Sequence, residues 1–292
     1  RSWKETAEGM REFYKDHDLP IRRLQERIKE LGGKITDRSN PYRDITLAYG
    51  RLERLYNKFV ENKMKPVLDT ISKINKAGIS GEEVLPYIIA KHALERNPDL
   101  RQKEVDKWIL KNQEASDAEI EAFAESLQGK DYAGVLPFTE KKDGSNDYEG
   151  RPDELARDIV DEFEAKVDPK LVDELWKNMK IASTETLNIW KASNTMSQEE
   201  YDYQLKRYKN FVPLRDWREG AAKELRYHKG QGFGASLRHA EGRRSLAENP
   251  LAYIEKVAFK ALGEQVDNEV KQAMLNLVLD NYDKPEFKSM YQ

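Results

Sequence analysis

Apolar side chains recur every three or four residues along most of this chain, which is the spacing of one face of an α-helix. From Pro41 the pattern predicts a long helix whose buried face carries Ile45, Ala48, Leu52, Leu55 and Phe59. Pro66 predicts a kink or a restart, and the stripe continues from there to Gly78. No segment alternates like a strand. The pattern therefore predicts an all-α protein without a substantial sheet, an elongated bundle of roughly ten helices in two lobes.

Several helix starts are marked by capping boxes, in which a Ser and a Glu three residues later bind each other's backbone N–H groups. The pair Ser80 and Glu83 predicts a helix that ends at about Arg96, with a separate helix over 103–113. The pairs Ser116 with Glu119 and Ser197 with Glu200 predict two more starts. Further helices are expected over 2–15, 20–31, 170–191 and 250–281.

The stretch Asp131–Gly150 interrupts the helical pattern with glycines, Pro137 and a polar run. Such a composition is typical of an exposed loop or hinge. We therefore expect an N-terminal lobe over 1–139 and a C-terminal lobe over 151–292.

Composition narrows the class of protein. The 292 residues are 35% charged and 38% hydrophobic, with no apolar run of membrane-spanning length and no signal-peptide pattern, so we expect a soluble, cytoplasmic protein. Zero cysteines exclude disulfides and thiolate zinc sites, and four histidines leave little for a metal cluster. We expect no metal and no cofactor. A start at Arg1 rather than at methionine indicates an excerpt from a longer polypeptide.

Charge is unevenly distributed along the chain. Residues 201–244 hold 11 Lys and Arg against 5 Asp and Glu, a net charge of +6, whereas the whole chain has −3. We call 201–244 the basic segment. Residues 143–174 hold 12 acidic and 4 basic residues, a net charge of −8. The two stretches pair with each other in the fold or face different partners.

The basic segment combines cations, aromatic rings and the glycine-spaced stretch Gly230–Gly234, a combination that suits a phosphate-bearing partner. Its candidate phosphate-binding cations are Arg207, Lys209, Arg215, Arg218, Lys229, Arg238, Arg243 and Arg244. Its candidate stacking rings are Tyr208, Phe211 and Trp217, for which core packing is the alternative. No set of residues in this segment specifies a reaction.

Other motifs favour structural interpretations. Residues 143–154 place oxygen-bearing side chains at the spacing of a calcium loop, but Tyr148 stands where such a loop needs glycine, which favours a solvated loop. The glycine spacing lacks the Lys-Ser or Lys-Thr ending of a nucleotide loop and indicates a connector. His92 and Glu95 share a helix face, and we favour a role in tying helices together over acid–base chemistry.

Four motifs occur in a fixed order: Ala90-Lys-His-Ala-Leu-Glu-Arg-Asn97, Phe211-Val-Pro-Leu-Arg215, Gly242-Arg-Arg-Ser-Leu-Ala-Glu-Asn-Pro-Leu251 and Asn268-Glu-Val-Lys-Gln-Ala-Met-Leu-Asn-Leu277. In these motifs the chain resembles a helical region of the very large polyvalent proteins of phages and conjugative elements. The resemblance is strongest to giant Bacteroides-type polypeptides that also hold a DNA methylase and a helicase. It implies an accessory α-helical domain, with other domains of the same polypeptide as partners and no catalytic set to transfer.

Three functions follow as hypotheses. The leading one is a non-catalytic module that contacts DNA or positions neighbouring domains of a mobile-element DNA methylase or helicase polypeptide. The second is a protein-interaction scaffold, whose acidic helices over 153–174 dock a basic segment of the same or another chain. The third is an unrecognised enzyme that uses His92, Glu95 or His239 in a cleft.

Overall fold

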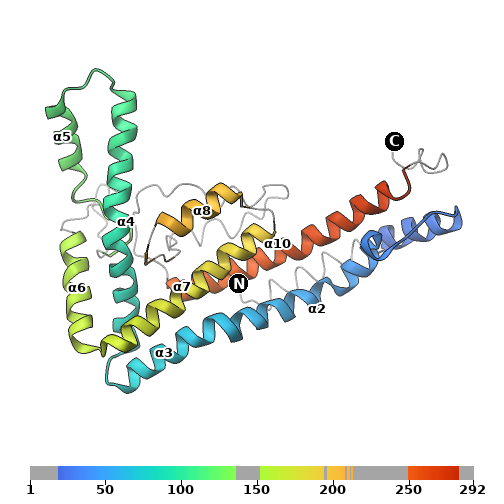
Figure 1. The fold of residues 1–292 in the computed structure, drawn as a ribbon, viewed down its shortest axis with the longest axis horizontal. Coiled ribbons are helices and arrows are strands. Elements are labelled where there is room, and N and C mark those ends of the chain that lie inside the picture. Colours follow the sequence, from blue (N-terminus) through green and yellow to red (C-terminus); the bar gives the residue numbers. More distant parts are fainter. Residues whose placement is uncertain are drawn as a thin grey trace, which may run out of the picture. The chain divides into compact units, whose positions relative to one another are not determined.

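The structure, a computed structural model, describes residues 19–135, 152–193, 196–207, 209–210, 212 and 249–282. Every regular element in this part of the chain is helical, so the predicted all-α class is confirmed (Figure 1). Among the described helices, none combines the length and the hydrophobicity that spanning a bilayer requires. Besides helical residues 19–30, the elements are η1 (Asp37–Ser39), α2 (Pro41–Phe59), η2 (Val60–Met64), α3 (Lys65–Lys76), α4 (Gly81–Lys111), α5 (Asp117–Ser126), α6 (Pro152–Lys166), α7 (Pro169–Ala192), α8 (Gln198–Arg207) and α10 (Pro250–Leu279).

The chain divides into two compact units. Among the described residues, unit 1 holds 19–59, 192–193 and 258–282, and unit 2 holds the rest. The sequence-based lobes, 1–139 and 151–292, do not coincide with these units. Unit 1 instead joins residues from near both ends of the chain.

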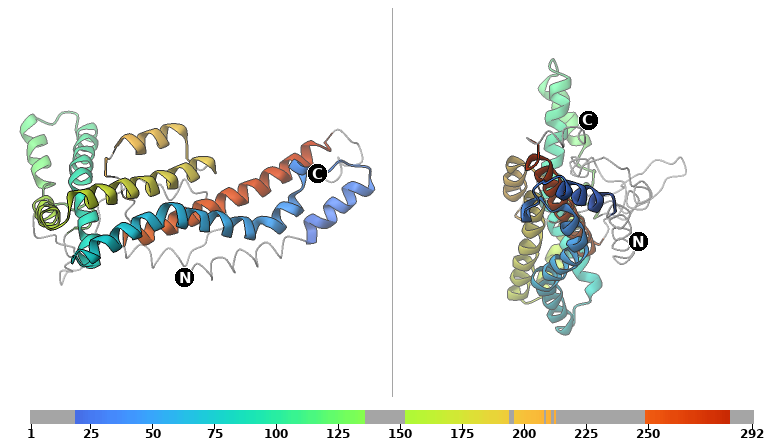
Figure 2. Two further views of the ribbon diagram at one scale, coloured as in Figure 1. Left: turned by 60° about the horizontal axis from the view of Figure 1, so that its bottom comes forward. Right: turned by 90° about the vertical axis from the view of Figure 1, so that its right-hand side faces the viewer.

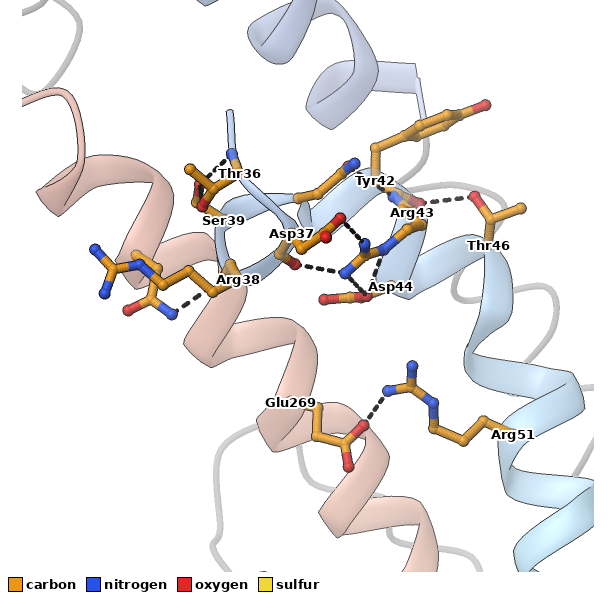
Figure 3. Close-up of polar contacts among 12 residues, drawn as sticks. Thr36, Asp37, Arg38, Ser39, Tyr42, Arg43, Asp44, Thr46, Arg51 and Glu269 are labelled. Atoms are coloured by element: carbon orange, nitrogen blue, oxygen red, sulfur yellow. Dashed lines mark hydrogen bonds and ion pairs between the residues drawn. The ribbon is translucent and has the colours of Figure 1, made fainter. Parts of the chain in front are cut away.

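In unit 1, α2 lies antiparallel to α10. The Tyr56 ring meets the Phe259 ring edge to face, with centroids 5.1 Å apart. Nearer the start of α2, Arg51 forms an ion pair with Glu269 of α10 (Figure 3). At the start of α2, the Arg43 guanidinium binds the carboxylate of Asp37 at 2.6 Å. Apolar and charged contacts together hold the two long helices side by side.

The segment before α2 is bound to the C-terminal end of α10. Asn281, which is 1% exposed, accepts the Lys34 N–H at 2.7 Å and donates to the Lys34 carbonyl at 2.9 Å. Arg38 binds Asp280 at 2.6 Å and holds the pKa of that carboxyl below its usual range. A buried side-chain amide that satisfies both backbone groups of one residue fixes the register between these segments.

Pro66 is accommodated by a change in helical winding. Residues Val60–Met64 form a π-helical segment, and α3 begins at Lys65 with Pro66 in its first turn. Because the chain is helical without interruption from Pro41 to Lys76, Pro66 removes one intrahelical N–H, and the wider π-helical turn just before it accommodates this loss. The observed restart agrees with the expectation from the sequence.

The separate helices expected up to Arg96 and over 103–113 are one helix, α4, which continues through Pro86 and Pro98. The prediction of a break was wrong because local signals favoured a stop, whereas side chains around Pro98 hold the helix against α6. Its start is as expected, since Ser80 accepts the Glu82 N–H at 3.2 Å and its own N–H binds Glu83 at 3.3 Å.

Unit 2 contains two antiparallel helix pairs, α4 with α6 and α3 with α7 (Figures 1 and 2). Residues 131–134 are buried next to α4, where the Arg96 guanidinium donates to the Tyr132 carbonyl at 3.0 Å. The exposed loop expected from Asp131 onward is therefore wrong for these four residues, and 136–150 lie outside the described residues.

Candidate nucleic-acid interface

Helix α8 contains the first described residues of the basic segment, and it lies along α7. The Tyr201 hydroxyl donates to Asn188 at 2.6 Å, and the Lys191 ammonium lies 4.7 Å from the centre of the Tyr201 ring. The expected capping box is present, since the Ser197 N–H binds Glu200 at 3.1 Å. These contacts fix the α8 backbone on unit 2 before the chain enters its most basic stretch.

Asn210, which lies three residues after the end of α8, is hydrogen-bonded to side chains of α4. Glu95 accepts both the Asn210 backbone N–H, at 3.1 Å, and its side-chain N–H, at 2.6 Å. His92, 0% exposed, lies with Nδ1 2.9 Å from the Asn210 carbonyl oxygen, a contact that requires a proton on Nδ1. The pair proposed from the sequence to share a helix face thus binds one asparagine, which agrees with the structural interpretation of His92 and Glu95.

The same α4 motif also holds α6. Asn97, 0% exposed, donates to Asp153 at 3.0 Å and accepts the Tyr132 N–H at 3.0 Å, while Arg101 pairs with the same Asp153. Lys91 binds Glu164 at 2.7 Å. The polar residues in and just after 90–97 therefore form the connection between α4 and its neighbours.

A buried aromatic cluster adjoins this connection. The Tyr87 ring stacks on Phe163 at a centroid distance of 4.0 Å, and its hydroxyl donates to Glu164 at 2.7 Å and accepts the Trp176 indole N–H at 2.8 Å. Burial, together with the nearby carboxylate, raises the pKa of Tyr87. Burial also acts to raise the pKa of Glu164, but hydrogen bonds from Lys91 and Tyr87 outweigh it and lower that pKa overall.

The inward carboxylates of the acidic stretch are bound to cations from earlier helices. Asp153 and Glu164 bind α4, and Glu174 binds Lys73 of α3 at 2.6 Å, which lowers the pKa of that carboxyl. Asp168 caps α7 by accepting the Lys170 N–H at 2.9 Å. These acids therefore stabilise unit 2 through contacts within its described part.

The outward face of α6 carries a second group of acids. Asp158, Asp161 and Glu162 are exposed, and Glu162 binds Lys166 of its own helix at 2.7 Å. We call these three residues the outer acidic row. Their spacing places them on the side of α6 that faces away from Val160 and Phe163.

The candidate interface residues are only partly within the described chain. Lys209 is exposed beside the anchored Asn210, and Arg207 ends α8 with only its backbone described. The remaining candidates lie outside the described residues, namely Tyr208, Phe211, Arg215, Trp217, Arg218, Lys229, Arg238, Arg243 and Arg244. The glycine-spaced stretch, His239 and most of the calcium-like loop also lie outside them.

Sequence reasoning missed two features of this region. Asn210 carries no motif of its own, and its role arises only because α4 places Glu95 and His92 beside it. Lys180 of α7 lies outside the basic segment, yet it lines the same surface depression as Lys209. A signal for Lys180 exists in the spacing of Lys177, Lys180 and Lys191, which share one helical face.

Within the described ranges, no three His, Asp or Glu side chains are grouped so that they could hold a metal ion. Comparison with protein-family models, with curated proteins and with solved structures gives no significant match.

Proposed function

We propose that this chain is a non-catalytic helical module that contacts DNA through residues 201–244 and so helps a larger DNA-processing polypeptide to hold its substrate. The resemblance to polyvalent proteins of mobile elements implies such a parent, whose neighbouring domains the module would position. A net charge of +6 over a segment rich in aromatic rings suits a polyanion.

One observation supports the proposal most strongly. The inward carboxylates of the acidic stretch, Asp153, Glu164 and Glu174, bind cations of α3 and α4. Within the described residues, neither Lys206 nor Lys209 forms an ion pair, and both are exposed. Unneutralised cations on a surface attract phosphate from a distance of about one Debye length, roughly 10 Å at 0.1 M salt.

The attachment of the segment supports the same function. On one side, Asn210 is bound to α4, and Val212 is 0% exposed. On the other, Asn249 caps α10 by accepting the Leu251 N–H at 2.9 Å. Both attachments belong to unit 2, so the stretch between them starts and ends on one compact body. Such attachment limits the entropy that the segment loses when it binds a partner.

Fluorescence anisotropy with labelled single- and double-stranded DNA tests this function. We expect the logarithm of the association constant to fall linearly with the logarithm of salt concentration, because each phosphate contact contributes about 0.9 to the slope. Arg243→Glu with Arg244→Glu removes two contacts and should weaken binding by at least about 60-fold at 0.1 M salt, from a loss of about 1.8 in the slope.

The matched control reverses two lysines outside the basic segment. Lys58→Glu with Lys107→Glu makes the same charge change at two exposed helical positions that have no ion pair among the described residues. This control should bind DNA within about threefold of the parent chain, since screening weakens distant charges. Equal loss in both double variants, or no loss with Arg243 and Arg244 reversed, would contradict the proposed interface.

The outer acidic row favours a second function, a protein-interaction scaffold that docks a basic segment. Asp158, Asp161 and Glu162 are exposed on one face of α6, which suits a basic partner. This function predicts a complex that forms without nucleic acid and is lost when the three residues are changed to Lys. Complexes that dissociate after nuclease treatment would contradict it.

A further inference from the structure

A small depression between α7 and α8 has a lysine from each side. Its lining residues are Lys180, Ser183, Thr184, Leu187, Gln204, Leu205 and Lys209. The described residues that line it include two exposed lysines and no acidic residue. The depression has room only for groups of about the size of water, which fits a phosphate oxygen better than a nucleobase.

The lysines are presented by a well-held backbone. Lys180 belongs to α7, which binds α3 through Asn178, whose side chain donates to the Thr70 hydroxyl at 3.0 Å. Lys209 precedes Asn210, which α4 holds. Both stems therefore start from fixed positions, and little further ordering of the backbone is needed to bind an anion.

The chemistry of the lining points to one kind of ligand. Two lysines at one depression place like charges on the same small surface, and an anion bound there would offset their repulsion. The hydroxyl of Thr184 and the amide of Gln204 can donate hydrogen bonds, and Lys, Ser, Thr and Gln are among the side chains that contact DNA phosphates. An acidic peptide would offer carboxylates on a flexible chain, whereas DNA supplies a regular row of phosphates that also reaches the basic segment.

We propose that Lys180 and Lys209 bind a phosphate of the DNA backbone in the depression between α7 and α8, so that the DNA path extends beyond residues 201–244 onto α7. This inference rests on the proposed function, because it assigns a further contact to the same DNA. It assigns a role to Lys180, a residue outside the basic segment, and makes Lys209 a link between the two surfaces.

The experiment measures the salt dependence of duplex binding by the full chain and by Lys180→Gln. Loss of one phosphate contact should lower the slope by about 0.9 and weaken binding by about eightfold at 0.1 M salt. Lys107→Gln is the matched control, since Lys107 is also an exposed mid-helix lysine of unit 2 but does not line the depression. Circular dichroism melting of each variant verifies that the fold is unchanged.

The possible outcomes distinguish the phosphate site at Lys180 and Lys209 from the proposed DNA contact through residues 201–244. A loss with Lys180→Gln but not with Lys107→Gln supports the phosphate site. Equal slopes for Lys180→Gln and the parent chain, with Arg243 and Arg244 still required, overturn the phosphate site and leave the proposed function intact. Equal losses in Lys180→Gln and Lys107→Gln overturn it too, because they show a dependence on total charge alone. A parent chain that binds no DNA overturns both.

Discussion

The connection between α4 and α6 should fail if Asp153 is removed. Asp153→Ala leaves the Arg101 guanidinium, whose side chain is 9% exposed, without its counter-ion, and it removes the acceptor of the Asn97 amide. Breaking a buried ion pair costs about 3–5 kcal/mol, and an amide without a partner adds about 1 kcal/mol. Because the Asp153 side chain is itself 20% exposed, water offsets part of this, and we expect a loss of about 3 kcal/mol.

Urea denaturation followed by circular dichroism measures this loss as a lower midpoint at an unchanged slope. Asp158→Ala, an exposed carboxylate on the same helix, is the control and should change the free energy of unfolding by less than about 0.5 kcal/mol. The double variant Arg101→Met with Asp153→Ala should recover about 1–2 kcal/mol relative to Asp153→Ala, because no unpaired charge remains buried. A double variant no more stable than Asp153→Ala would refute the argument that the buried guanidinium causes the loss.

Two further predictions concern the aromatic cluster of unit 2. Tyr87→Phe removes the hydroxyl that donates to Glu164 and accepts the Trp176 indole N–H. It should lower the free energy of unfolding, measured by urea denaturation, by about 2–4 kcal/mol. The control Tyr203→Phe, at an exposed ring, should change that free energy by less than about 0.5 kcal/mol. Equal effects of the two changes would argue against the buried hydroxyl network. Burial acts to raise the pKa of Glu164, but Lys91 and Tyr87 outweigh it and hold that pKa below its ordinary 4.5. The ionised Glu164 carboxylate therefore stabilises the fold above about pH 4.5, and this stabilisation is lost as the pH falls through the lower pKa of the folded state. Lys91→Met should therefore make the free energy of unfolding fall less steeply below pH 4.5, and an unchanged pH profile would contradict the assigned ion pair.

Local signals in the sequence predicted the helix starts well. The capping boxes at Ser80, Ser116 and Ser197 each involve residues three positions apart, so no distant part of the chain has to be known. The break expected before residue 103 failed for the opposite reason. Pro98 removes one N–H, but Asn97 and Arg101 bind Asp153 on α6, more than 50 residues away in the chain, and these contacts hold the helix together.

The candidate site was predictable only in part, because some of its contacts join residues that are far apart in the chain. A count of charges located the basic segment, and helix spacing placed His92 and Glu95 on one face. Neither reveals that Asn210 binds both of these residues, because the Asn210 contacts join positions 115 and 118 residues apart. Propensity and periodicity describe neighbours along the chain, whereas the anchoring of the segment depends on which helices pack together.

The acidic stretch, residues 143–174, shows why the net charge of a segment is a poor guide to the charge that it exposes to a binding partner. On α6 the buried side is marked by Val160 and Phe163, and Glu164 flanks it and is bound within the fold. Asp158 and Asp161 lie on the opposite side, exposed. An ion-paired carboxylate near the core, such as Glu164, would first have to leave its cation before it could bind another molecule. A charge of −8 therefore overstates the attraction between the two stretches.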